Sequence, residues 1–204
     1  IGSTTQSNCR CGHQWTVRGT LRGYGDYWRR NSQVITTLFL LATATATQTQ
    51  FHADEAPNNC SNCATWNLQH APFKIYGNSY YVGVDGLSSV LITSDEGHIL
   101  IDGGLPQSAK LIAKNIEQLG FSIKDVKGLL NSHAHYDHAG GLAALQRMSG
   151  AQLFASEDSA QAMKSGKTLA SDPQAGYGDV MNFPAISNIN IIVNGEKIKL
   201  GDNV

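Results

Sequence analysis

The sequence carries few charged residues and almost no net charge. Charged side chains make up 15% of its 204 positions, and 15 basic against 16 acidic residues leave a formal net charge of −1. Binding to nucleic acid phosphates favours a basic protein, so this composition argues against nucleic acid as a partner. The apolar run that begins at Val34 is shorter than the roughly 20 residues of a membrane-spanning helix. We therefore expect no stable membrane anchor.

Cysteine and methionine are also scarce. The chain has four cysteines, and no second suitable pair accompanies Cys60-x-x-Cys63 to complete a zinc site. Cys60 and Cys63 either close a small disulfide loop, or one of them pairs with a cysteine elsewhere, and the sequence leaves both alternatives open. The first methionine is Met148, which bears on where the native chain starts.

The N-terminal residues differ in composition from the rest. Residues 1–33 hold five arginines and one acid, a balance of +4, so residues 34–204 hold ten basic and fifteen acidic side chains, a balance of −5. Residues 1–28 show neither a helical nor a strand period, and we predict that residues 1–33 are a non-globular leader that need not belong to the native coding sequence. Residues 34–53 hold a short apolar core and an A-x-A run and follow the basic pair Arg29-Arg30, which together form the pattern of a secretory signal peptide. A buried strand or helix is the alternative there.

Residues 54–204 have the pattern of an α/β domain. Two β-rich segments flank Asp85-Gly86, a strong hairpin turn, and later strands alternate with amphipathic helices. Such alternation predicts helices that cover the faces of a sheet. We expect strands over 79–84, 88–93, 99–101, 126–130 and 153–155, helices over 105–119, 142–149 and 157–165, and a final hairpin over 189–193 and 197–200.

Four potential metal ligands follow the strand expected over 126–130. His133, His135, Asp137 and His138 form an H-x-H-x-D-H pattern that a Gly-Gly pair closes. Side chains two positions apart on an extended segment point the same way, and a helical turn would bring the last two into the same pocket. Imidazole and carboxylate are ligands that zinc accepts. A polar turn with solvated histidines is the plainer alternative, but the density of the cluster predicts a metal site.

Four segments together resemble the metallo-β-lactamases, most closely those of subclass B3. They are residues 71–78, the hairpin through Asp85-Gly86, residues 100–104 and residues 131–141. The H-x-H-x-D-H motif alone marks only the superfamily, and the flanking segments give the narrower likeness. The resemblance implies an αββα sandwich, of which this chain holds the N-terminal half or a little more. It also implies a periplasmic or secreted bacterial enzyme that hydrolyses the β-lactam amide through a zinc-bound hydroxide and so confers antibiotic resistance.

The same resemblance assigns roles to individual residues. His133 and His135 would bind the first of two zinc ions, and Asp137 and His138 the second, with Asp137 also orienting the catalytic water. Asp102 would support the metal loop through hydrogen bonds, although a simple turn residue is an equal alternative. By analogy with family members, we expect three aromatic side chains, Trp66, Tyr177 and Phe183, to line the β-lactam pocket. The alternative is that these residues simply pack in the domain.

The likeness also has departures. Each zinc in the family takes one more histidine from the C-terminal half, and a catalytic zinc normally has three protein ligands. We therefore expect those ligands beyond Val204, and little hydrolysis by residues 1–204 alone. Another hydrolase of the superfamily, such as a glyoxalase II-like thioesterase or a lactonase, and a non-catalytic remnant are the alternatives. The sequence does not determine the preferred β-lactam or the oligomeric state.

Overall fold

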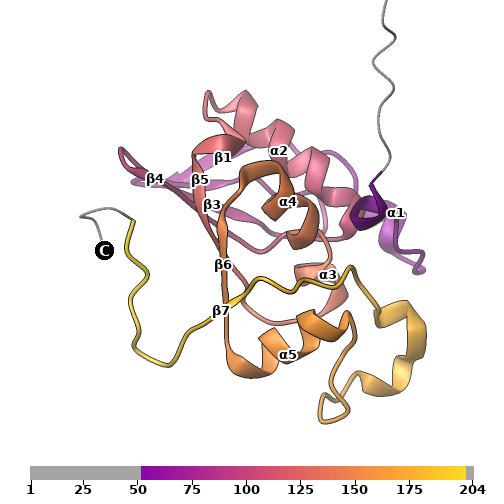
Figure 1. Cartoon of the computed structure of the whole chain (residues 1–204). Coiled ribbons are helices and arrows are strands. Elements are labelled where there is room, and N and C mark those ends of the chain that lie inside the picture. The colour runs from indigo at the N-terminus through magenta and orange to yellow at the C-terminus, as the bar shows by residue number, and fades with distance from the viewer. Residues whose placement is uncertain (1–51, 201–204) are drawn as a thin grey trace, which may run out of the picture. The chain divides into compact units, whose positions relative to one another are not determined.

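A computed structural model describes residues 52–200, which contain one mixed sheet of seven strands in sequence order (Figure 1). Strands β1 to β4 pair antiparallel, and β4 to β7 pair parallel. The strands are β1 (Phe73–Tyr76), β2 (Ser79–Tyr81), β3 (Val90–Ser94), β4 (Gly97–Ile101), β5 (Val126–Leu130), β6 (Gln152–Ala155) and β7 (Asn190–Ile191).

Four leucines form a row across the centre of the sheet. Leu91 of β3 lies opposite Leu100 of β4. Leu100 lies beside Leu129 of β5, and Leu129 lies beside Leu153 of β6. All four side chains are fully buried, and burial of each contributes roughly 1.5–3 kcal/mol to stability. The next side chain along β3, Ile92, points to the opposite face because strand side chains alternate, and it is only partly buried.

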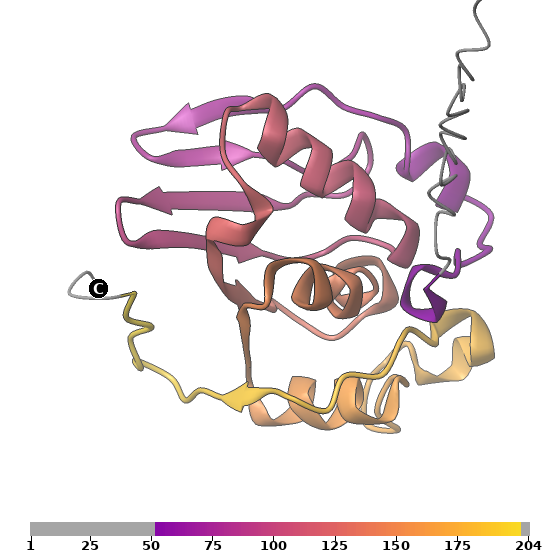
Figure 2. The same cartoon turned by 45° about the horizontal axis from the view of Figure 1, so that its top comes forward.

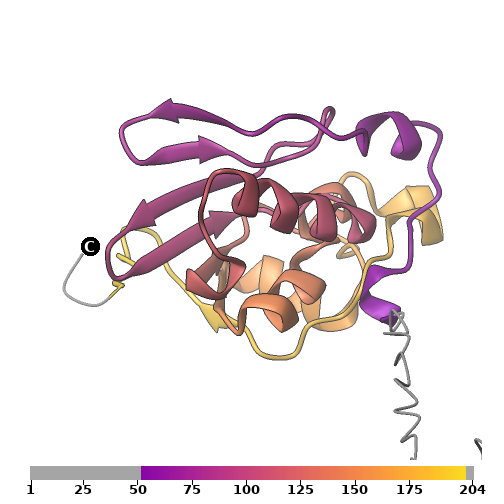
Figure 3. The same ribbon diagram turned by 90° about the horizontal axis from the view of Figure 1, so that it is seen from above.

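Two α-helices lie side by side against one face of the sheet (Figures 2 and 3). Their buried side chains include Ile112 and Ile116 in α2, and Leu142 and Leu145 in α4. The helix expected over 105–119 begins as a 3-10 turn, where proline suits the first position. The helical elements are η1 (Ala53–Glu55), α1 (Cys63–Trp66), η2 (Pro106–Ser108), α2 (Ala109–Gln118), η3 (Ile123–Asp125), α3 (Tyr136–Ala139), α4 (Leu142–Ser149), α5 (Glu157–Ser165) and η4 (Ala175–Met181).

The hairpin turn predicted at Asp85-Gly86 is present in the structure. Val84 and Leu87 exchange backbone hydrogen bonds around Asp85-Gly86, which closes the β2–β3 hairpin. Helices α4 and α5 each end at a glycine in the left-handed conformation, Gly150 (φ 78°) and Gly166 (φ 68°). Glycine is the usual residue at this position because it has no Cβ to clash.

The predicted final hairpin over 189–200 is wrong. Asn190–Ile191 forms the two-residue strand β7, which pairs parallel with β6 because the chain reaches it through α5, a crossover connection. Asn194 and Gly195 do form a turn, but residues 197–200 form no strand antiparallel to β7. Strand β1 (Phe73–Tyr76), by contrast, was missed. It lies at the sheet edge with all four residues exposed, so it lacks the alternating burial that marks a strand.

The segment before β1 contains a small disulfide loop and is attached to the domain by hydrogen bonds. Cys60 and Cys63 form a disulfide with each other, which decides between the two alternatives that the sequence left open. The carbonyls of Trp66 and Leu68 accept hydrogen bonds from Gly86 and Asp85 of the hairpin turn. The leader predicted over 1–33, nearly all of the signal peptide predicted over 34–53, and residues 201–204 lie outside the described residues. Within residues 52–200, no helix is long and apolar enough to cross a membrane.

Candidate metal centre

The histidine loop connects the end of β5 to helix α3. Residues 131–135 leave the sheet without regular structure, and His135, in extended conformation (φ −93°, ψ 154°), immediately precedes α3. Asp137 and His138 lie within α3. The expected arrangement of an extended segment followed by a helical turn is therefore present, and all four candidate ligands belong to one short stretch.

Close backbone packing between two glycine pairs fixes this loop against the end of β4. The backbone N–H of Gly103 donates to the carbonyl of His138 (2.8 Å), and that of Gly141 donates to the carbonyl of Gly104 (3.1 Å). A Cβ on Gly141 would lie 2.1 Å from the Gly103 carbonyl oxygen, which is too close for any other residue. The Gly-Gly pairs thus permit the approach that places Asp102 beside the histidines.

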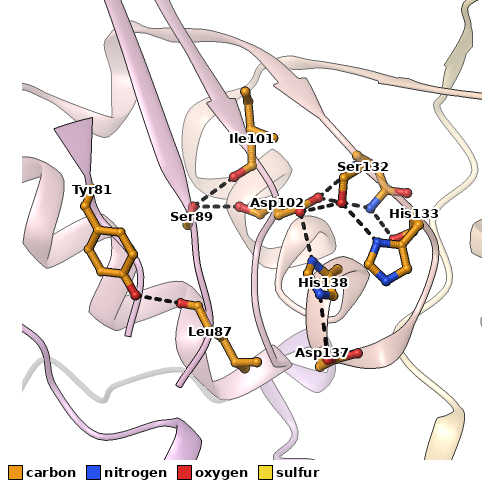
Figure 4. Close-up of polar contacts among 10 residues, drawn as sticks. Tyr81, Leu87, Ser89, Ile101, Asp102, Ser132, His133, Asp137 and His138 are labelled. Carbon is orange, nitrogen blue, oxygen red and sulfur yellow. Dashed lines mark hydrogen bonds and ion pairs between the residues drawn. The ribbon is translucent and has the colours of Figure 1, made fainter. Parts of the chain in front are cut away.

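The buried carboxylate of Asp102 is the hydrogen-bonding hub of the loop (Figure 4). Its Oδ1 accepts from the backbone N–H of Ser132 (2.8 Å), and its Oδ2 accepts from Ser132 Oγ (2.6 Å) and His138 Nδ1 (2.9 Å). Asn131 Nδ2 contributes a longer contact of 3.4 Å. Asp102 has a φ of 61°, a conformation that aspartate tolerates better than most residues. This geometry favours the supporting role over that of a simple turn residue.

The three histidines lie close together and are each held through one ring nitrogen. The ring centroid of His133 lies 4.6 Å from that of His135 and 4.0 Å from that of His138. His138 donates from Nδ1, because a carboxylate only accepts hydrogen bonds. Ser132 gives its hydroxyl hydrogen to Asp102, so its Oγ accepts from His133 Nδ1 at 3.1 Å.

The third histidine is held by a residue that the sequence did not identify. His135 Nε2 lies 2.8 Å from Oδ2 of Asp172, in the connection between α5 and η4. Because Asp172 can only accept, His135 donates from Nε2 and its Nδ1 keeps a lone pair. The two residues are 37 positions apart, so no local sequence pattern indicated this contact; the sequence showed only two acids, Asp172 and Asp179, in the polar 166–188 connection.

In its neutral form each histidine therefore retains one lone-pair nitrogen: Nε2 of His133, Nδ1 of His135 and Nε2 of His138. A metal-ligating histidine typically donates its other ring N–H to an oxygen, which fixes the tautomer and the ring direction. Asp137 Oδ2 lies 3.7 Å from His138 Nε2, so a carboxylate stands beside one of these nitrogens. The chemistry of this donor set fits zinc, which binds neutral imidazole and carboxylate.

The surroundings of the loop shift the pKa values of His133 and His138 in opposite directions. Burial lowers the pKa of His133, and its neighbours His138 and His135 add to that effect, which favours the neutral ring that a metal ligand requires. The hydrogen bond to Asp102 raises the pKa of His138 despite its burial. The backbone N–H of Gln174, followed by the hydrogen bond from His135, lowers the pKa of the Asp172 carboxyl.

No three His, Cys, Asp or Glu side chains within residues 52–200 converge closely enough to hold a metal ion by themselves. A zinc ion bound by two of the loop ligands would need at least one more, since catalytic zinc sites use three protein ligands. The loop thus brings together candidate ligands whose rings are held by hydrogen bonds, and these form only part of a site.

The three aromatic residues predicted for the substrate pocket lie in different surroundings. Phe183 is buried in the core, Trp66 is partly buried, and Tyr177 is 70% exposed. Trp66 packs against the hairpin turn, where a Cβ on Gly86 would lie 2.6 Å from Trp66 Cδ1. A cavity of about 260 Å³ beside the metal loop has none of the three in its lining, which is His133, Ala134, Asp158, Ser159, Ala162, Thr168, Leu169, Ser171, Asp172 and Pro173.

Comparison with known proteins gives consistent matches. The family model "Metallo-beta-lactamase superfamily" matches residues 82–196, more than half of the chain. The solved structure of Rm3 metallo-beta-lactamase is 50% identical with a TM-score of 0.67, over 71% of this chain and 53% of that one. MEM-A1, described as a subclass B3 metallo-beta-lactamase from a soil metagenome library, is 50% identical with a TM-score of 0.64, over 67% of this chain and 51% of that one.

Among curated proteins, Exodeoxyribonuclease YycJ of Bacillus anthracis is 35% identical over 88 residues, which are 43% of this chain and 29% of that protein. The chain thus spans about half the length of the solved structures and less than a third of this curated relative.

Proposed function

This chain belongs to the metallo-β-lactamase superfamily, and we propose that it forms the half of a secreted β-lactam hydrolase that contains the histidine loop, residues 131–141. The observation that carries the proposal is the ordered hydrogen bonding of His133, His135 and His138, each donating one ring N–H to an oxygen and keeping one lone pair. The 50% identity to Rm3 and MEM-A1 supports the choice of β-lactams within the superfamily.

The residues divide between two zinc ions. His133 and His135 would hold the first ion, and Asp137 and His138 the second, with one further protein ligand needed for each. Zinc bound there supplies Lewis-acid chemistry: it lowers the pKa of a water and polarises the carbonyl under attack.

The side chains around the metals hold the water and the loop. The Asp137 carboxylate accepts a hydrogen bond from the attacking water and so fixes its direction toward the lactam carbonyl. Asp102 keeps His138 oriented through Nδ1 and binds Ser132, so its negative charge supports two ligand positions at once. The Cys60–Cys63 disulfide fits the oxidising compartment in which such an enzyme would meet its substrate. The aromatic side chain of Tyr177 is accessible to contact substrate, whereas Trp66 and Phe183 would shape the pocket indirectly.

A chimeric protein tests the proposal directly. Residues 52–200 would be joined to the part of Rm3 that this chain does not cover, and penicillin, cephalosporin and carbapenem hydrolysis would be followed by absorbance with and without a chelator. We expect chelator-sensitive hydrolysis that His133→Ala abolishes, and far less hydrolysis by the 204-residue chain alone. A chimera that folds and binds two zinc ions but opens none of these rings would contradict the proposal.

Exonuclease activity is the second candidate, because curated exodeoxyribonucleases match 87–88 residues at 35–36% identity. The net charge of −1 disfavours it, since DNA binding draws on basic side chains. Linear DNA with free ends, incubated with the same zinc-loaded proteins, separates the two: degradation of DNA without lactam hydrolysis would favour the nuclease.

A further inference from the structure

Asp172 differs from the other residues that support the metal loop because it comes from a separate part of the chain. Ser132 is adjacent to His133 in sequence, and Asp102 ends the neighbouring strand β4. Asp172 lies beyond α5, yet its Oδ2 is 2.8 Å from His135 Nε2. The side chains of His135 and Asp172 are 17% and 27% exposed, so this contact lies at the edge of the site.

The backbone around Asp172 holds the carboxylate in place. Its other oxygen, Oδ1, accepts a hydrogen bond of 2.7 Å from the backbone N–H of Gln174. Its own N–H donates to the carbonyl of Leu169 (2.9 Å), and its carbonyl accepts from the N–H of Ala175 (3.0 Å). With one carboxylate oxygen committed to the backbone, the other is presented to His135 in a fixed direction.

We propose that Asp172 is a positioning residue that locks His135 in the Nε2–H tautomer and turns its Nδ1 toward the zinc. The identity of the metal rests on the proposed function, whereas the hydrogen bond between His135 and Asp172 is present in the structure whatever that function is. A neutral imidazole has two tautomers, and only a partner at one nitrogen selects between them. The carboxylate also makes the ligating nitrogen more basic.

The consequence is that the 166–188 connection controls one ligand of the first zinc. His133 and His138 are oriented by residues of the β4 and β5 ends, which the glycine contacts hold together. His135 instead depends on a loop whose position is set outside the histidine segment. Loss of Asp172 should therefore weaken the first zinc site while leaving His133 and His138 in their tautomers.

Three variants of the 204-residue chain test this: Asp172→Ala, Asp172→Asn and Asp158→Ala. Asp158 is exposed and lines the same cavity beside the metal loop as Asp172. Within residues 52–200 it makes no hydrogen bond to the three histidines, so Asp158→Ala removes one negative charge near the site without removing a histidine partner. Histidine 15N chemical shifts of the metal-free proteins report each tautomer. Competition with a chromophoric chelator reports the affinity for Zn²⁺.

We expect the metal-free wild type and Asp158→Ala to show His135 as the Nε2–H tautomer, and Asp172→Ala to show a mixture. Asp172→Asn has one acceptor oxygen for the two donors, the Gln174 N–H and the His135 Nε2–H, and should therefore show less of the Nε2–H tautomer than the wild type. Zinc affinity should fall about 10- to 100-fold in Asp172→Ala and stay within about threefold of wild type in Asp158→Ala.

An unchanged His135 tautomer in a folded Asp172→Ala protein, checked by circular dichroism, would overturn the inference, as would equal losses of affinity in Asp172→Ala and Asp158→Ala. Failure of the chimera with the Rm3 part, which supplies the further ligands, to bind zinc would instead count against the proposed function, because the tautomer measurement needs no metal.

Discussion

Asp102 and His138 lie 36 positions apart in the sequence, and Asp102 Oδ2 accepts a hydrogen bond of 2.9 Å from His138 Nδ1. The bond ties the end of β4 to the first turn of α3, across the parallel pairing of β4 with β5. Because Ser132 also donates to the same carboxylate, one buried acid organises both ends of the histidine segment.

Replacing Asp102 by alanine should destabilise the domain. The exposed Ser132 and the partly buried His138 would lose their charged acceptor, and a hydrogen bond to a charged group contributes about 1.5–3 kcal/mol. Alanine is also less favourable than aspartate at a φ of 61°. Asp102→Asn, which tolerates that conformation and keeps one acceptor, should lose less. Urea denaturation measures both, with Asp95→Ala in the exposed β3–β4 turn as the control. Equal unfolding free energies for Asp102→Ala and Asp95→Ala would contradict this.

The contact between Gly141 and Gly103 should not tolerate a side chain. In Gly141→Ala the new Cβ would lie 2.1 Å from the Gly103 carbonyl oxygen, so the backbone of the metal loop has to shift. We expect a loss of roughly 1–3 kcal/mol or more and weaker zinc binding. Gly176→Ala is the control, since no atom lies within 4 Å of its Cβ. Equal thermal unfolding midpoints for the two variants would contradict the close packing of Gly141 against Gly103.

Acid should weaken the attachment of η1 to α4 through Glu55. Burial by itself would raise the pKa of Glu55, but hydrogen bonds and charges from Lys110 and Arg147 lower it below the ordinary 4.5. A carboxyl with a lowered folded-state pKa contributes stability above its unfolded pKa, and this contribution is lost as pH falls through the folded-state value.

The wild-type urea midpoint should therefore fall more steeply below about pH 4.5 than that of Glu55→Gln, which cannot titrate. A matched exposed change, Glu117→Gln, should leave the wild-type profile intact. Parallel pH profiles for the wild type and Glu55→Gln would show that the ion pairs of Glu55 add no pH-dependent stability.

Zinc should stabilise the 204-residue chain, and a chelator should reverse the effect. A ligand that binds only the folded state adds about 2.7 kcal/mol when present at 100 times its Kd. His133→Ala and His138→Ala should each reduce the zinc-dependent rise in melting temperature, whereas His70→Ala, outside the histidine loop, should keep it. The measurement is differential scanning fluorimetry over a zinc titration. An equal rise in all three variants would place the bound zinc elsewhere.

The local features of this protein were predictable because they depend on neighbouring residues. The fold class and the likeness to subclass B3 metallo-β-lactamases, inferred from segments such as residues 100–104 and 131–141, are confirmed by the seven-stranded α/β domain and its structural relatives. The Asp85-Gly86 hairpin followed from turn chemistry, and the helix expected over 157–165 is present as α5. The assignment of metal ligands and the signal peptide stay predictions.

The H-x-H-x-D-H ligand types and their spacing are determined by the sequence alone, as are the short apolar runs that contain the four leucines of the row. Only the tertiary structure decided which oxygen holds each distant histidine, since His138 meets Asp102 across 36 positions and His135 meets Asp172 across 37. It also decided that β7 pairs parallel with β6 rather than closing a hairpin. The physical reason is the same in each case: local propensity sets what a residue can do, whereas the path of the chain sets which partner it meets.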